Sequence, residues 1–223
     1  MCIRDSHNYC IYTYNQTDGR GQIGRKWHTG SGDNLACSFY IQVHKTNVKD
    51  QFNINCAVCL ALYDTINRYI PKENVKIKWP NDLYIDNKKV AGILIQNQIK
   101  GHQINRATIG IGININSQEF PEEILNPVSI YQLLKKESRI NIIELLHELS
   151  INLSERLNQM TFRDVRTEYI SKLYRHNETH KFHSEKDGLL DGRIVDITRE
   201  GKLMIEINSN IKEFAFREVS YII

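Results

Sequence analysis

The stretch "VKIKWPNDLYIDNKKVAGILIQNQIKGHQINRATIGIGININ", Val75 to Asn116, decides the fold class of this chain. Four short segments in it alternate between apolar and polar residues or run apolar, and they cover residues 75–80, 82–85, 90–99 and 106–116. Turn-forming sequences, "DNKK" and "KGHQ", separate the longer segments. A period of two is typical of strands that bury one face. The stretch therefore predicts a meander of antiparallel strands.

Helical patterns lie on both sides of this meander. Residues 50–70 carry apolar residues at helical spacing, with Asp50 as a candidate N-cap and Pro71 as a stop. Further helices are expected at "SIYQLLKK", which begins at Ser129, at residues 141–160 and at residues 162–174. The second of these places one apolar stripe on a single face, formed by Ile142, Leu145, Leu146, Leu149, Leu153 and Leu157.

The C-terminal part has a different character. The polar stretch 175–187, "RHNETHKFHSEKD", shows no periodicity and predicts a linker. Its histidines are expected to be solvated, with metal binding as the alternative. Residues 192–223 show period-two strands broken at "REG" and "NSN", which predicts a small β unit docked on the larger domain. The expected architecture is α+β, with a mixed or antiparallel sheet and packed helices in residues 1–178, followed by a small β barrel in residues 179–223.

Composition excludes several classes of protein. The chain has 223 residues, of which 41% are hydrophobic and 25% charged, and this is the range of ordinary globular proteins. A formal net charge of +3 does not by itself favour a nucleic-acid partner. We find no apolar run of membrane-spanning length and no signal peptide, so a cytoplasmic location is expected. Cys56 and Cys59 form a C-x-x-C inside the predicted helix 50–70, where buried structural thiols are favoured over a redox or metal site.

Four segments carry side chains suited to chemistry. In "QTDGRGQIGRKW", Gln16 to Trp27, glycines and arginines suit a bound phosphate or carboxylate, although a solvated surface loop has the same composition. "KWPND", residues 78–82, is either a ligand-binding turn or a structural Pro-Asn-Asp turn. Lys89 precedes a strand. "GIGININ" has glycines that permit close approach, or mark a bulge in a buried strand.

Taken together and in this order, the four segments resemble the biotin protein ligase family. The family pattern has a QTxGRGxxGRxW loop, then KWPND, then a lysine before AGIL, then a GxGIN strand, and the separation of seven residues between Asp82 and Lys89 also fits. The resemblance implies a catalytic domain like that of class II aminoacyl-tRNA synthetases and a C-terminal SH3-like domain. It further implies a short form of the enzyme, without an N-terminal DNA-binding domain.

The activity that the resemblance implies has two steps. Biotin and ATP would form biotinyl-5′-adenylate with release of pyrophosphate, and biotin would then pass to a lysine of a biotin carboxyl carrier domain, as in acetyl-CoA carboxylase. ATP, Mg²⁺ and biotin are the implied ligands and the carrier domain is the implied partner, with neither nucleic acid nor membrane, and a homodimer is left open. The second step must produce a neutral amine, which costs a free lysine roughly 4 to 5 kcal/mol at pH 7.

The same resemblance assigns roles to residues of this chain. Lys89, Asp82 and Arg20 would be catalytic, with Lys89 holding the biotin carboxylate and Asp82 orienting the acceptor amine and taking its proton. The implied biotin contacts are Gln16, Gly19, Arg20, Gly21, Gln22, Lys89 and Gly92. The implied ATP contacts are Arg20, Arg25, Trp27, Lys78, Asn81 and Asn114. No residue is assigned to a metal ion.

Two departures from the family pattern lead to further expectations. Gln22 stands where several family members have arginine, which removes a charge from the cover of the adenylate. A Ser-Thr-Asn segment that usually lines the biotin ureido pocket does not occur before Gln16, which predicts weak biotin binding. The missing segment motivates one alternative, a truncated homologue that binds carrier domains without catalysis. A second alternative is a lipoate or octanoyl ligase, which shares the fold but is disfavoured by KWPND and the GRG loop.

Overall fold

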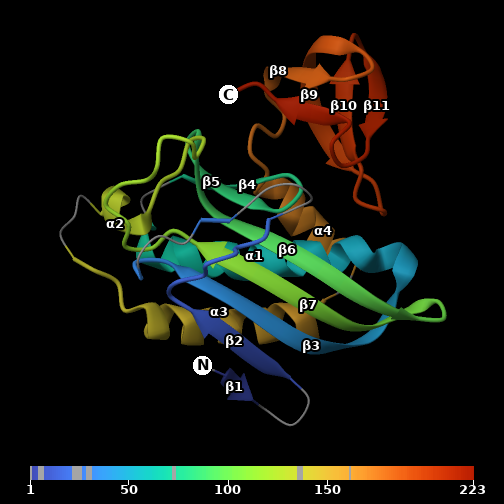
Figure 1. Cartoon of the computed structure of the whole chain (residues 1–223). Helices are drawn as coiled ribbons and strands as arrows, with labels where there is room; N and C mark the ends of the chain where they lie inside the picture. The colour runs from blue at the N-terminus through green and yellow to red at the C-terminus, as the bar shows by residue number, and fades with distance from the viewer. Residues whose placement is uncertain are drawn as a thin grey trace.

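Two antiparallel sheets form the frame of the protein, as the computed structural model in Figure 1 shows. The structure describes residues 2–4, 8–21, 27–28, 32–71, 74–134, 138–160 and 162–223. The larger sheet has seven strands in the order β1-β2-β3-β7-β6-β5-β4. These strands are β1 Cys2–Arg4, β2 Tyr9–Thr13, β3 Leu35–Asn47, β4 Val75–Lys78, β5 Asp82–Ile85, β6 Lys88–Lys100 and β7 Gln103–Ile113. The expected α+β class with antiparallel pairing is therefore confirmed.

The predicted meander is the run from β4 to β7, in which each strand pairs with the next. The alternation that predicted it also sets its two faces, because successive side chains of a strand point to opposite sides. Ile109, Ile111 and Ile113 of β7 belong to the hydrophobic core, whereas Gly110 and Gly112 between them face the other side. The long strand β3, which pairs with β7 over most of its length, was not predicted.

Helices cover the core face of this sheet. They are α1 Gln51–Tyr69, α2 Ile130–Leu133, α3 Ile142–Asn158 and α4 Phe162–Ser171, preceded by the short 3-10 helix Val48–Asp50. In Figure 1, α1 and α3 lie behind β3, β6 and β7. The predicted apolar stripe of α3 is confirmed, since Leu145, Leu146, Leu149 and Leu153 are buried. Ser129 caps α2 as expected, with its hydroxyl accepting from the amide of Gln132.

One capping prediction is only half right. Asp50 stands at the N-cap position of α1, but its side chain makes no capping hydrogen bond. The carboxylate instead pairs with the guanidinium of Arg199, whose Nη2 lies 2.8 Å from Oδ2. A tertiary partner has therefore replaced the local one.

The second sheet has the strand order β11-β10-β9-β8-β12 and lies beyond the β4–β5 edge of the first (Figure 1). Its strands are β8 Thr179–Ser184, β9 Gly188–Ile197, β10 Leu203–Ile207, β11 Asn210–Phe214 and β12 Val219–Tyr221. The expected linker over 175–187 is wrong in part, because β8 lies inside it. Strand β8 pairs with β9 and β12, and Phe182 is fully buried. Two partner strands and one core aromatic thus outweigh its polar composition.

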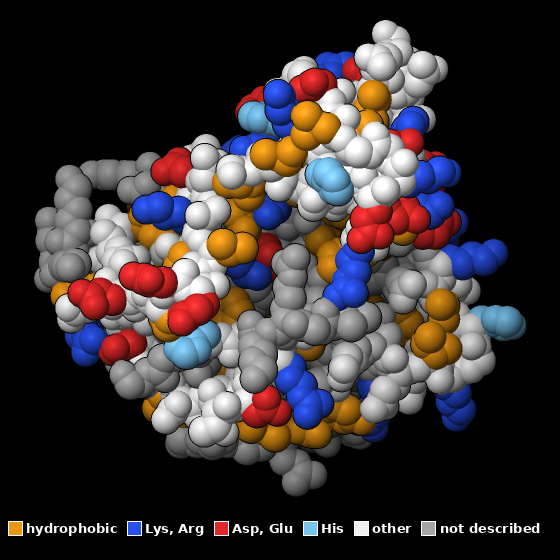
Figure 2. All heavy atoms as spheres, turned by 45° about the horizontal axis from the view of Figure 1, so that its top comes forward, with side chains coloured by type: hydrophobic (Ala, Val, Ile, Leu, Met, Phe, Trp, Pro, Cys, Tyr) orange, Lys and Arg blue, Asp and Glu red, His pale blue; other side chains and the backbone are white. Residues whose placement is uncertain are grey.

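Cys56 and Cys59 are completely buried in α1, and burial raises the pKa of both thiols, as expected of structural cysteines. No helix in the described part of the chain is long and apolar enough to cross a bilayer. Over the same residues, no group of three or more histidine, cysteine or acidic side chains is arranged to hold a metal ion. Basic and acidic side chains are intermixed on the face seen in Figure 2.

Candidate active site

A cavity of about 510 Å³ opens on the face of the large sheet that the helices leave free. Strands β2, β3, β6 and β7 contribute to its lining, together with Asn81 and Asp82 at the start of β5. Gln16, Asp18, Arg20 and Gly21 of the glycine-rich loop complete it together with Trp27, whereas Gly19, a predicted biotin contact, is not part of the lining. The cavity therefore gathers the glycine-rich loop, the KWPND turn and the lysine before AGIL, which are separated in the sequence.

Small residues make the floor of this cavity. In the strand register, Ala36 and Ser38 of β3 lie opposite Gly112 and Gly110 of β7, and Gly112 lies opposite Gly92 of β6. A Cβ atom at Gly112 would overlap the indole of Trp27, so the ring lies directly on the backbone of the sheet. The floor leaves room for a flat aromatic side chain and for a ligand beside it.

A lysine and an aspartate face each other at one side of the floor. Lys89 Nζ lies 2.7 Å from Oδ1 of Asp82, and the two side chains are 27% and 20% exposed. A Cβ at Gly92 would stand 3.0 Å from Lys89 Nζ and 3.2 Å from Asp82 Oδ1, so glycine there leaves space for the pair. The ammonium also lies 5.6 Å from the ring centroid of Trp27. The site thus combines a cation, a carboxylate and an aromatic face.

The backbone around Lys89 is tightly held. Its amide donates to the carbonyl of Asn126 at 2.6 Å, and its own carbonyl accepts from the amide of Val128 at 3.0 Å. The side-chain amide of Asn114, which is buried, donates to the same Lys89 carbonyl at 3.3 Å. Asn114 therefore holds the backbone of Lys89 and is not part of the cavity lining.

Lys78 is also separated from the cavity. Its ammonium lies 4.6 Å from the ring centroid of Tyr84 and 5.1 Å from that of Tyr221, among aromatic rings at the junction with the second sheet. Asn81, in contrast, lines the cavity, and its side chain donates to the carbonyl of Ile93. Of these three expected ATP contacts, Asn81 lines the cavity, and Lys78 and Asn114 do not. The nucleotide-binding roles of Lys78 and Asn114 stay predictions.

The glycine-rich loop forms part of the rim. Gln16, Arg20 and Gly21 line the cavity, and the carbonyl of Gly19 accepts from the amide of Trp27 at 2.9 Å. Arg20 faces Asp18 at 3.7 Å with both side chains largely exposed, a pair of the kind that contributes little to stability. The predicted contacts Gln22 and Arg25 lie outside the described residues.

Several lining residues were missed in the sequence. Ser38, Leu94, Gln96 and Thr108 all line the cavity. Three of them could have been found by period two, since Leu94 and Gln96 follow Gly92 at steps of two and Thr108 precedes Gly110 by two. Ser38 lies on β3, so its position needed a strand pairing that no sequence pattern supplied.

The comparisons with known proteins agree with this geometry. The model of the biotin/lipoate A/B protein ligase family matches residues 4–114. The chain belongs to this family. As a family member it has curated relatives that include the bifunctional ligase/repressor BirA of Bacillus subtilis, with 30% identity over 207 residues, which is 89% of this chain and 61% of that protein. The BirA protein of Escherichia coli is 31% identical over 121 residues, 54% of this chain and 37% of its own length.

A solved structure of the family extends the likeness to almost the whole chain. The biotin protein ligase from Aquifex aeolicus in complex with biotin and ATP superposes with a TM-score of 0.72 at 28% identity, covering 95% of this chain and 87% of that one. The chain spans between 37% and 61% of the length of the BirA proteins named above.

Proposed function

We propose that this family member is an ATP-dependent biotin protein ligase, which activates biotin as biotinyl-5′-adenylate and transfers it to a lysine of a biotin carboxyl carrier domain. The observation that carries the proposal is the Lys89–Asp82 pair beside Trp27 on a glycine floor, in a cavity of about 510 Å³. A small apolar ligand with one carboxylate matches that combination, and the complex of the Aquifex aeolicus relative contains biotin and ATP.

In the first step, an oxygen of the biotin carboxylate attacks the α-phosphorus of ATP and pyrophosphate leaves. Lys89 would hold the carboxylate by a charge-assisted hydrogen bond, and Arg20 at the rim would face the phosphates. Bringing two anions together is the main barrier here, so positive charge placed in advance at the meeting point lowers it. Trp27 would cover the apolar part of the ligand.

In the second step, the acceptor lysine of the carrier attacks the acyl carbon of the adenylate, AMP leaves and an amide forms. The amine must lose a proton, and Asp82 would accept it. In the structure, Asp82 is paired with Lys89 at 2.7 Å. A ligand carboxylate or acyl phosphate that engages Lys89 would compete for this contact and leave Asp82 available to the amine.

Mg²⁺ is part of the proposal only as a companion of the nucleotide. Among the described residues, the acidic side chains in the lining are Asp18 and Asp82, and they face the cations Arg20 and Lys89. These residues do not form a site for Mg²⁺ by themselves, since such sites use unpaired carboxylates or phosphate oxygens. The chemistry assigned above to Lys89 and Asp82 involves no metal ion.

We also propose the finer architecture that the family resemblance implies. Residues 1–178 would form a catalytic domain like that of class II aminoacyl-tRNA synthetases, and residues 179–223 an SH3-like domain. Supporting the division, β1 to β7 pair among themselves and β8 to β12 pair among themselves. We further propose a carboxylase carrier domain as the acceptor and a cytoplasmic location for the chain.

Release of pyrophosphate that depends on biotin tests the function. With ATP and Mg²⁺, the chain is expected to release pyrophosphate on addition of biotin, and to make a carrier domain reactive to streptavidin. Release with lipoate or octanoate in place of biotin would indicate the related ligase. Binding of the carrier without pyrophosphate release would indicate a non-catalytic homologue, and either result would overturn the proposal.

A further inference from the structure

The carbonyl oxygen of Pro80 accepts hydrogen bonds from side chains that do not line the cavity. Asn55 Nδ2 of α1 donates to it at 2.7 Å, and the hydroxyl of Tyr169 of α4 donates at 2.8 Å. The thiol of Cys59, also on α1, makes a longer contact of 3.8 Å with the same oxygen. A carbonyl oxygen has two lone pairs, and the two short hydrogen bonds from Asn55 and Tyr169 occupy both. Because the donors belong to different helices, the carbonyl is fixed from two directions.

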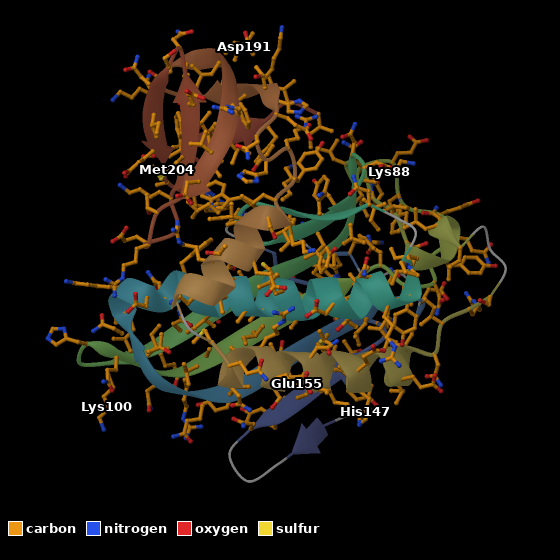
Figure 3. All side chains as sticks on the ribbon, turned by 180° about the vertical axis from the view of Figure 1, so that it is seen from behind. Lys88, Lys100, His147, Glu155, Asp191 and Met204 are labelled. Carbon is orange, nitrogen blue, oxygen red and sulfur yellow. The ribbon has the colours of Figure 1, made fainter. Side chains whose placement is uncertain are left out.

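Both donors are well placed to stay in position. Tyr169 is completely buried, and its ring packs edge-on against Phe52 with centroids 5.6 Å apart. Burial raises the pKa of the Tyr169 hydroxyl, so it remains a donor throughout the neutral range. Helix α4 lies between α1 and the second sheet, as Figure 3 shows from behind. Asn55 is half-buried on the neighbouring helix α1.

The held carbonyl belongs to the peptide that leads to the catalytic aspartate. A peptide unit is planar, so fixing the Pro80 oxygen fixes the plane that also contains the amide of Asn81. The carbonyl of Asn81 accepts from the amide of Ile93 at 3.0 Å, which anchors the next unit on β6. Asp82 follows immediately, opposite Gly92, with its carboxylate 2.7 Å from Lys89 Nζ.

We propose that Asn55 and Tyr169 are positioning residues: by holding the Pro80 carbonyl they set the place of Asp82 relative to Lys89 and to the incoming amine. The kinetic part of this inference rests on the proposed function, because the amine and its transfer belong to that reaction. A displacement of about 1 Å at a reacting group can reduce a rate by about 100-fold. The two donors therefore act on the transfer step through Asp82, without touching the substrate.

Tyr169→Phe is the most direct test, because it removes one hydroxyl and keeps the ring on Phe52. Asn55→Ala removes the other donor. Each variant is expected to lower the rate constant for transfer from pre-formed adenylate to carrier by about 10-fold to 100-fold. The KM for biotin is expected to change less than about 2-fold, because neither side chain lines the cavity. A general loss of stability would not lower the transfer rate constant while leaving the KM for biotin nearly unchanged.

Asn152→Ala supplies the matched control. Asn152 lies on α3, is similarly half-buried, and its amide donates to the hydroxyl of Thr65 at 2.8 Å. This variant loses a comparable hydrogen bond to α1 away from the cavity, so its transfer rate is expected to stay normal. Equal rates for wild type, Tyr169→Phe and Asn55→Ala would overturn the positioning role, as would an equal loss in Asn152→Ala.

A structural measurement separates this inference from the proposed function. In a crystal structure of Tyr169→Phe, the Asp82–Lys89 distance is expected to lengthen from 2.7 Å or the Asp82 side chain to become disordered. If the wild-type chain releases no pyrophosphate with biotin, the proposed function fails, and the crystal structure of Tyr169→Phe alone decides the positioning role. An unchanged Asp82–Lys89 contact in the crystal structure of Tyr169→Phe would overturn the positioning role.

Discussion

Lys89 Nζ and Asp82 Oδ1 lie 2.7 Å apart, so the cation and the carboxylate of the site neutralise each other. The pair is joined across two strands, and a Cβ in place of the Gly92 hydrogen would meet both side chains. An anionic ligand must therefore compete with Asp82 for Lys89. This competition predicts opposite effects on ligand binding for the two residues.

Lys89→Ala should abolish formation of the adenylate. Loss of a partly buried, charge-assisted contact to a carboxylate costs about 2 to 5 kcal/mol, which corresponds to roughly 30-fold to several thousand-fold. Lys88→Ala is the matched control, because Lys88 is the exposed neighbour of Lys89 and the first residue of β6 (Figure 3). Exchange of labelled pyrophosphate into ATP in the presence of biotin measures the step. Near-normal exchange by Lys89→Ala would contradict the assignment of this lysine.

Asp82→Asn should bind biotin at least as tightly as wild type and transfer it slowly. Asparagine keeps the shape of the turn but cannot take the amine proton, and loss of a general base lowers a rate by about 100-fold to 10,000-fold. Calorimetry with biotin gives the binding affinity, and single-turnover transfer from pre-formed adenylate gives the transfer rate. Asp86→Asn, an exposed change four residues along, serves as control. Wild-type transfer by Asp82→Asn would exclude the base role.

Gly112→Ala should displace the indole of Trp27 from the sheet, because the added Cβ would overlap the ring. Gly110→Ala is the comparison, since its nearest neighbour, the carbonyl oxygen of Leu94, would be at an ordinary 3.5 Å. The emission of Trp27 is expected to shift to the red in Gly112→Ala alone, while Trp79 stays buried in both. The affinity of Gly112→Ala for biotin should fall about 10-fold or more, because the ligand loses the aromatic cover of Trp27. Identical spectra for the two variants would show that the ring does not rest on Gly112.

The meander could be predicted because its signal is local, whereas the role of Lys89 was assigned from the family pattern. Alternation over 75–116 and the helical stripe of α3 each depend on residues near in the sequence, and the strands and the helix form in these regions, although β7 covers Gln103–Ile113 and not 106–116. The Asp82–Lys89 contact was also accessible, since the two residues lie on adjacent strands of one hairpin, β5 and β6.

What could not be predicted depends on distant partners. Strand β8 is polar in composition and forms because β9 and β12 flank it. The carboxylate of Asp50 turns from its helix to Arg199, 149 residues further on. The side chain of Asn114, whose nucleotide role stays a prediction, donates to the backbone of Lys89, 25 residues earlier in the chain.

The Asp50–Arg199 pair links the second sheet to the start of α1, and its contribution should depend on pH. The hydrogen bond from Arg199 lowers the pKa of Asp50 below its ordinary value in the folded protein. A group whose pKa is lowered by folding stabilises the protein above its unfolded pKa, about 4 for aspartate, and loses this effect as the pH falls through the folded value. Arg199→Met should therefore lower Tm at pH 7, and the difference from wild type should shrink below about pH 4.

The control for this last prediction comes from the same hairpin. Lys202 pairs with Glu213 at 3.3 Å within the second sheet, and both side chains are about half exposed. Lys202→Met removes one positive charge without touching the contact with α1, so its Tm should remain close to wild type across the pH range. Thermal unfolding of the three proteins from pH 7 to pH 3 gives the comparison. A Tm difference for Arg199→Met that persists unchanged at pH 3 would mean that Arg199 stabilises the protein by packing and not through the Asp50 carboxylate.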